Sequence, residues 1–218
     1  MTIRPAQTAV GWLLAIAIWA AVPADCAGQS SADAPPLDDR FSRFFQLAGG
    51  AIAGLAIHES GHLFFDVLFD ADPGIARVDL GGIPFFAIEH TAALSPRREF
   101  VVSSAGFWMQ HLTSEWLLTA RPGLRHQRGP VAKGLLAFNL LTSVGYASAA
   151  FARGGPAERD TRGMADSIAM DERWIGAMIL APAILDAWRY IRPDAIWAKW
   201  GSRAAKIVLV GLVVKSSR

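Results

Sequence analysis

The chain has 218 residues, enough for one domain with a sizeable core or for two small domains. Hydrophobic residues make up 52% and charged residues 18% of it, whereas typical soluble domains carry about 25% charged residues, so the composition favours a membrane protein. The net charge is +2 and the 21 basic residues are scattered, which argues against a nucleic-acid partner. The single cysteine, Cys26, excludes an internal disulfide and a cysteine-based zinc site.

The N-terminal region is typical of a secreted or membrane-inserted chain. Residues 1–24 combine a basic start at Arg4 with an apolar run and small residues, and they predict a signal peptide or, if uncleaved, a signal anchor. Residues 25–43 are polar and rich in turn-forming residues, and they predict a linker. Residues 44–218 are then expected to form the membrane-embedded domain of an integral membrane protein, with a bacterial inner (plasma) membrane as the expected location.

The segment 44–69 is apolar and long enough to cross a bilayer, but it contains the motif His-Glu-Ser-Gly-His. On a helix, residues four apart share a face, so His58 and His62 can bind the same ion. Glu59 lies beside that face, where it can take a proton from a water molecule instead of binding the metal. This is the H-E-x-x-H pattern of metalloproteases, and it predicts a Zn²⁺ site. The pattern also occurs by chance, but burying these groups in lipid without a function is costly.

Small residues continue the same stripe of this helix. Gly50 and Gly54 precede His58 at four-residue intervals, and Asp66 follows His62 at the same interval. Small residues let helices approach closely, so the stripe is expected to face the interior of a helix bundle. Asp66 is then predicted to orient His62 as a hydrogen-bond acceptor behind the metal.

The elements that follow predict a mainly α protein. Two β-prone runs, 75–80 and 83–89, predict a hairpin at the membrane surface. A helix is expected to begin with Ser95 as N-cap and Pro96 at its first position and to run to about residue 118. Further apolar helices are predicted over 131–152, 174–191 and 204–214, joined by a basic loop at 121–130 and a polar connector at 153–173. The expected fold is a polytopic membrane helix bundle, with four or five helices after the signal and a small β-hairpin insertion.

The motif and its surroundings resemble the site-2 protease family of intramembrane zinc metalloproteases. The likeness covers roughly residues 44–190 and rests on residues 58–62 with Gly61 before the second histidine, on the β-rich insertion, and on residues 95–106, SPRREFVVSSAG, which look like the family's next core helix. The resemblance implies that the two histidines are zinc ligands and that Glu59 is the catalytic acid/base.

The family's third zinc ligand is an aspartate in an N-x-x-P…L-D-G motif, which this chain lacks. Asn139, the only asparagine, lies in an apolar helix as the family's does. Two aspartates remain as candidates. Asp160 precedes a helical stretch and suits a ligand at a helix start, although plain N-capping explains it as well. Asp186 lies in an apolar helix, but a pair with Arg189 already explains it, so Asp160 is preferred.

Four other polar residues are not assigned to the predicted metal site. His111 and Glu115, four residues apart, are interpreted as a polar pair that stabilises the bundle. Glu89 and His90 are given no role in the site.

Three functions follow from these observations. The first is a membrane zinc metalloendopeptidase that cleaves a membrane protein or peptide, with an extended substrate pairing with the edge of the 75–90 hairpin. The alternative is a catalytically inactive membrane scaffold or binding protein; the missing third-ligand motif favours it, and the retained Glu59 opposes it. A transporter is also considered, but the chain lacks an inverted repeat and paired broken helices. Membrane lipid is an expected partner in each case.

Overall fold

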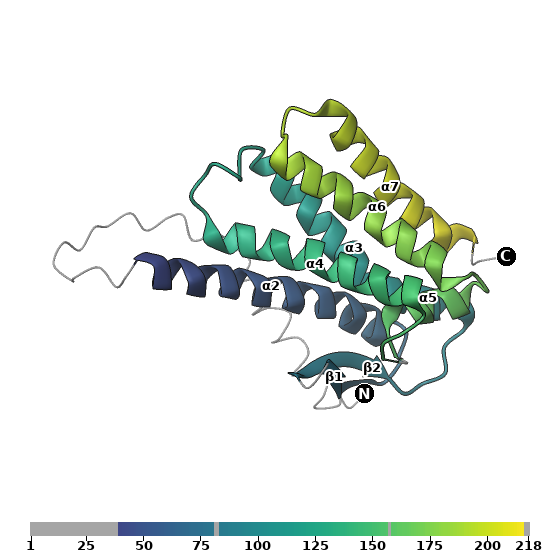
Figure 1. The fold of residues 1–218 in the computed structure, drawn as a ribbon. Helices are drawn as coiled ribbons and strands as arrows, with labels where there is room; N and C mark the ends of the chain where they lie inside the picture. The colour runs from purple at the N-terminus through teal and green to yellow at the C-terminus, as the bar shows by residue number, and fades with distance from the viewer. Residues whose placement is uncertain (1–38, 81–82, 157, 216–218) are drawn as a thin grey trace.

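The computed structural model describes residues 39–80, 83–156 and 158–215, which form six helices and one hairpin (Figure 1). The predicted signal sequence and most of the predicted linker lie outside these residues. In chain order the elements are α2 (Asp39–Leu68), β1 (Pro73–Leu80), β2 (Ile83–His90), α3 (Pro96–Ala120), α4 (Pro130–Ala152), α5 (Asp160–Ser167), α6 (Glu172–Ile191) and α7 (Ile196–Lys215). The mainly helical fold with a small two-stranded sheet agrees with the prediction.

Several element boundaries differ from those predicted. Helix α2 begins at Asp39, so residues 39–43, predicted as linker, belong to its first turns. Helix α7 begins at Ile196, eight residues before the apolar run that predicted it, because the polar residues at its start continue the same helix. Helix α3 begins at Pro96 as predicted, but the Ser95 side chain makes no capping hydrogen bond.

The predicted hairpin is confirmed. Strands β1 and β2 pair in antiparallel register, with Ile75 opposite Ile88 and Leu80 opposite Ile83. The hairpin lies beside the C-terminal half of α2 (Figure 1). The turn between α2 and β1 places Asp70 at a φ of 55° and Asp72 at 57°, left-handed conformations that aspartate tolerates better than most residues. This turn reverses the chain, and β2 returns alongside the helix.

Helices α2 and α4 pack closely because glycines remove side chains from their interface. A Cβ added to Gly50 of α2 would overlap the Val131 carbonyl of α4. In the same way, a Cβ added to Gly134 of α4 would overlap the Leu47 carbonyl of α2. A Cβ added to Gly54 would lie 2.7 Å from the Phe138 ring. The prediction that the small-residue stripe of α2 faces the bundle interior is therefore confirmed.

An apolar core holds the remaining helices together. It consists of Phe100 and Phe107 from α3, Met164 and Ala165 from α5, Ile175 and Ile179 from α6, and Leu209 from α7. Since Met164 is fully buried here, the short helix α5 is anchored to the bundle by its own apolar face. This anchoring fixes the start of α5, where Asp160 lies.

Among the described residues, two helices are long and apolar enough to cross a membrane. They are α4, with 23 residues, and α6, with 20 residues. This agrees with membrane association as a coarse prediction. Four or five membrane helices stay a prediction, because only these two meet the length and hydropathy expected of a span within the part of the chain that is described.

Candidate metal centre

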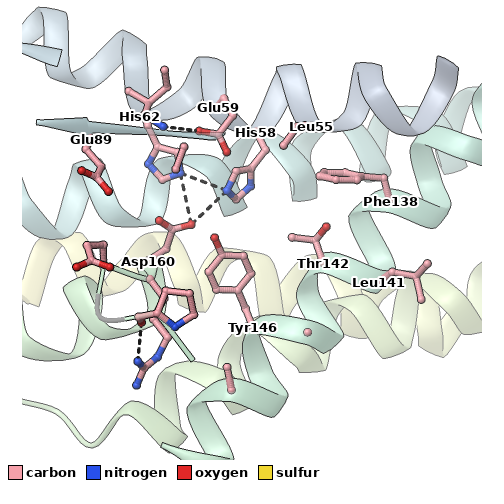
Figure 2. A pocket seen from close by; sticks show the side chains of 17 residues that line it. Leu55, His58, Glu59, His62, Glu89, Phe138, Leu141, Thr142, Tyr146 and Asp160 are labelled. Carbon is pink, nitrogen blue, oxygen red and sulfur yellow. Dashed lines mark hydrogen bonds and ion pairs between the residues drawn. The ribbon is translucent and has the colours of Figure 1, made fainter. Parts of the chain in front are cut away.

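The fold brings three predicted ligand residues together from two distant parts of the chain (Figure 2). His58 and His62 lie one turn apart on α2 and are almost fully buried, and Asp160 is the first residue of α5. The Oδ2 atom of Asp160 lies 3.2 Å from His58 Nε2 and 3.4 Å from His62 Nε2. The two Nε2 atoms are 3.2 Å apart. The structure brings Asp160, the aspartate that the sequence favours, beside the two histidines, and its role as a metal ligand stays a prediction.

The spacing of these three atoms fits a tetrahedral zinc ion. Ligand atoms bound at zinc–nitrogen and zinc–oxygen distances of 2.0 to 2.1 Å in a tetrahedron lie about 3.3 Å from one another. Two nitrogens and one carboxylate oxygen form a donor set that zinc accepts, with a fourth position left for water or substrate. The residues present therefore fit the metal that the motif predicts.

The backbone of α3 orients His62. Its Nδ1 lies 2.9 Å from the Val102 carbonyl oxygen. A carbonyl only accepts hydrogen bonds, so Nδ1 is protonated and donates, which leaves Nε2 as the nitrogen that would bind a metal. Sequence reasoning missed this contact, since no local pattern reveals which carbonyl of another helix faces a side chain.

Asp66 does not orient His62, and that prediction was wrong. The fully buried Asp66 carboxylate instead lies 3.3 Å from Nδ1 of His90 on β2, and Nε2 of His90 lies 3.0 Å from Glu99 on α3. Asp66 is one helical turn beyond His62, where strand β2 covers α2. These three residues therefore link the hairpin to the two helices.

Asp160 is held in position by the residues on either side of it. The Arg159 guanidinium donates two hydrogen bonds, of 2.6 and 2.5 Å, to the Glu172 carboxylate, and the Thr161 hydroxyl donates to the same carboxylate at 2.7 Å. Burial by itself would raise the pKa of the Asp160 carboxyl, but the two neighbouring imidazoles outweigh it and hold that pKa below its ordinary range. The Asp160 carboxyl is thus ionised beside the two histidines.

Glu59 lies beside the ligand cluster and is not part of it. Its Oε2 accepts a 2.9 Å hydrogen bond from the backbone N–H of Ile88 on β2. Because this N–H bonds to Glu59 and not to β1, the edge of β2 at Ile88 faces α2. The carboxylate is therefore held beside the cluster at the edge of β2, and its role as a general base stays a prediction.

Asp186, the other candidate third ligand, lies in a different cluster. Its carboxylate contacts Arg189 at 3.1 Å, Lys206 at 2.8 Å and the Ser202 hydroxyl at 2.6 Å. The pair with Arg189 expected from the sequence is confirmed. With these partners Asp186 needs no metal to explain its burial.

Two more polar residues, Asn139 and Glu115, have partners that sequence reasoning did not identify. The Asn139 amide donates to the Gln110 carbonyl at 3.1 Å and to the Ser114 hydroxyl at 2.9 Å, so it joins α4 to α3. Glu115 stabilises the bundle as expected, but through Arg189 and not through a contact with His111.

A cavity of about 480 Å³ opens beside the ligand cluster. Its polar end contains His58, Glu59, His62 and Asp160, and the apolar end is lined by side chains of α2 and α4 that include Leu55, Phe138 and Leu141 (Figure 2). Residues 87–89 of β2 form a third wall. A concave site with a few convergent polar groups and an apolar extension is what a substrate-binding site requires.

Comparisons with protein-family models, with curated proteins and with solved structures give no match for this chain. The function of the protein is therefore inferred from the residues and geometry of the site.

Proposed function

We propose that this protein is a membrane-embedded zinc metalloendopeptidase of the site-2 protease-like kind, which hydrolyses a peptide bond in or near the membrane. The observation that carries the proposal is the cluster of His58, His62 and Asp160, whose three ligand atoms lie 3.2 to 3.4 Å apart at the end of a cavity. Glu59 lines the same cavity and supplies the carboxylate that hydrolysis needs.

In this proposal each residue has a distinct task. His58, His62 and Asp160 would hold zinc, which supplies Lewis-acid activation of a water molecule and of the substrate carbonyl. Glu59 accepts the proton of the attacking water and later returns it to the leaving amine, the usual cycle of a general acid/base. The hydrogen bond from Ile88 N–H keeps Glu59 on the cavity side of α2.

The shape of the cavity supports an extended peptide as substrate. Residues 87–89 of β2 line the cavity. The Ile88 N–H is bonded to Glu59, so an extended chain would pair with other backbone groups of this strand, in line with the pairing expected from the sequence. The apolar wall formed by Leu55, Phe138 and Leu141 suits an apolar substrate side chain next to the cleaved bond. Such side chains are common in membrane-spanning segments.

Exposed apolar side chains support a lipid environment. Phe44 and Ile52 on α2 are 62% and 66% exposed, and Ile207 on α7 is 70% exposed. Together with the two candidate spans α4 and α6, these faces would be covered by hydrocarbon in a bilayer. The proposed location is a bacterial inner (plasma) membrane.

The proposal is tested first by zinc content. The protein is purified in detergent from the membrane fraction, and zinc per chain is measured by mass spectrometry for the unaltered protein and for His58→Ala, Asp160→Ala and Asp186→Ala. We expect about one zinc per chain, strongly reduced in His58→Ala and Asp160→Ala and retained in Asp186→Ala, since a ligand has to be present and deprotonated to bind.

Hydrolysis is tested next with Glu59→Gln and apolar membrane peptides as substrates. Zinc content should be unchanged while the hydrolysis rate falls by about 10²- to 10⁴-fold, the usual contribution of a general acid/base. Absence of zinc from a folded, metal-replete sample would overturn the enzyme proposal. Zinc binding without hydrolysis by the unaltered protein would favour the catalytically inactive scaffold.

A further inference from the structure

Tyr146 of α4 contacts the candidate metal centre from the side opposite to α2. Its ring lies 6.1 Å from the His58 ring, centroid to centroid, and packs edge-on against Phe107 at 5.0 Å. Phe107 is fully buried and itself contacts His58 at 5.6 Å. The tyrosine ring is therefore held between the core and one of the histidines, with little freedom to move.

The hydroxyl group of Tyr146 points toward the Asp160 carboxylate (Figure 2). Both histidine contacts use the Oδ2 atom of Asp160, so the second oxygen of the carboxylate remains able to accept a hydrogen bond. Arg159 and Thr161 fix the backbone on either side of Asp160 through Glu172, but they leave the rotation of its carboxylate free.

Asn139, two helical turns before Tyr146 on α4, is not available to bond to the Asp160 carboxylate. Its amide group is already bonded to α3, through the Gln110 carbonyl and the Ser114 hydroxyl. Thr142, one turn before Tyr146, lines the cavity, but its side chain is shorter by an aromatic ring. Tyr146 is thus the residue of α4 that approaches two of the three candidate ligands.

We propose that Tyr146 is a positioning residue of the metal centre: its hydroxyl donates a hydrogen bond to the Asp160 carboxylate, and its ring supports the His58 imidazole. The inference rests on the proposed zinc site and adds a residue that the H-E-x-x-H motif does not contain. Hydrogen bonds to the outer side of metal ligands set their orientation, and losing one typically lowers metal affinity about 10- to 100-fold. Asp160 needs such support more than the histidines do, because it lies at the end of a short helix, whereas both histidines are on the 30-residue helix α2.

The test compares zinc affinity for the unaltered protein, Tyr146→Phe and Tyr190→Phe. Affinity is measured by competition with a chromophoric zinc chelator after the metal has been removed. Tyr146→Phe keeps the ring and removes only the hydroxyl, and we expect about 10- to 100-fold weaker binding. Tyr190 is the only other tyrosine and packs in the separate apolar cluster around Leu136, so Tyr190→Phe should bind zinc like the unaltered protein.

A second measurement separates positioning from general support of the fold. The melting temperature of the metal-free protein should be the same with and without Tyr146→Phe, because the ring packing is retained. In the Asp160→Asn background, Tyr146→Phe should weaken the residual zinc binding much less than it does in the unaltered protein, since the two residues act together.

The outcomes distinguish this inference from the proposed function. Equal zinc affinity of Tyr146→Phe and the unaltered protein, or equal losses in both backgrounds of the cycle, would overturn the role of Tyr146 and leave the zinc site intact. Failure of the unaltered protein to bind zinc would overturn both. Weaker zinc binding that accompanies a lower melting temperature of the metal-free variant would also overturn positioning, in favour of a structural role.

Discussion

His58 and His62 are held in different ways although they are neighbours in one motif. His62 donates to the Val102 carbonyl, whereas His58 Nδ1 is buried and has no hydrogen-bond partner among the described residues. The His58 ring is instead held in place by packing contacts, since it lies against Gly106 and edge-on to Phe107. A Cβ on residue 106 would overlap the ring atoms of His58. Gly106 is therefore part of the site without any polar contact.

The expected result of Gly106→Ala is a displaced His58 ring and loss of zinc binding. A shift of about 1 Å is enough to spoil ligand geometry, and zinc affinity should fall at least about tenfold. Gly49→Ala is the matched control, because nothing lies within 4 Å of a Cβ at that position of α2. Zinc titration of both variants checks the prediction; unchanged affinity in Gly106→Ala would show that α3 moves to accept the methyl group.

At the scale of elements, the geometry of the candidate metal centre depends on how α5 is attached to α6. Glu172 at the start of α6 accepts hydrogen bonds from Arg159 and Thr161, the two neighbours of Asp160. Arg159 and Glu172 are 8% and 11% exposed, so this ion pair is shielded from solvent. A buried ion pair joined by two parallel hydrogen bonds is stronger and more specific than a solvent-exposed ion pair. It determines where the first turn of α5 presents Asp160.

Glu172→Gln is expected to weaken zinc binding without removing a ligand. The amide can accept from Arg159 or from Thr161 but loses the charge, so the start of α5 becomes less well fixed and zinc affinity should fall by up to about tenfold. The adjacent Asp171→Asn is the matched control, because Asp171 bonds to the exposed Arg153 and to the N–H of Arg173 and not to α5. Equal zinc affinity in both variants would contradict the argument.

Across the whole molecule, a second polar cluster joins α3, α6 and α7 and takes no part in the candidate site. Glu115 contacts Arg189 at 2.5 Å, Arg203 at 2.8 Å and Lys206 at 3.1 Å, and Lys206 also contacts Asp186 at 2.8 Å. Asp186 and Arg189 are almost fully buried. Charges so placed require partners, and apart from the Asp186–Arg189 pair within α6 these partners lie on another helix. The cluster therefore stabilises the bundle.

Asp186→Ala should destabilise the protein and leave its zinc content unchanged. Removing one partner from a buried ion cluster leaves the others less well compensated, and we expect a loss of about 3 kcal/mol in the free energy of unfolding, measured by denaturation in detergent. Asp166→Ala removes an acid whose side chain is 75% exposed and lies 3.6 Å from Arg162, and it should cost less than about 1 kcal/mol. Zinc loss in Asp186→Ala at full stability would instead favour Asp186 as the ligand.

The sequence by itself determined the features that depend on near neighbours in the chain. Helical periodicity places His58 and His62 on one face with Glu59 beside it. Two short β-prone runs separated by a pair of glycines determine the hairpin. Pro96 and the flanking turn residues give the start of α3. Each of these follows from local backbone geometry, so the structure agrees with them.

Only the tertiary structure decided which distant residues meet. Asp160 lies 102 residues from His58 in sequence, and either it or Asp186 was compatible with the local patterns. The acceptor for His62 turned out to be a backbone carbonyl of α3 and not Asp66, and Tyr146 approaches the site only because glycines draw α4 against α2. Such contacts depend on how helices pack side by side. No short-range pattern encodes that packing, because it is the sum of many weak interactions between segments far apart in the chain.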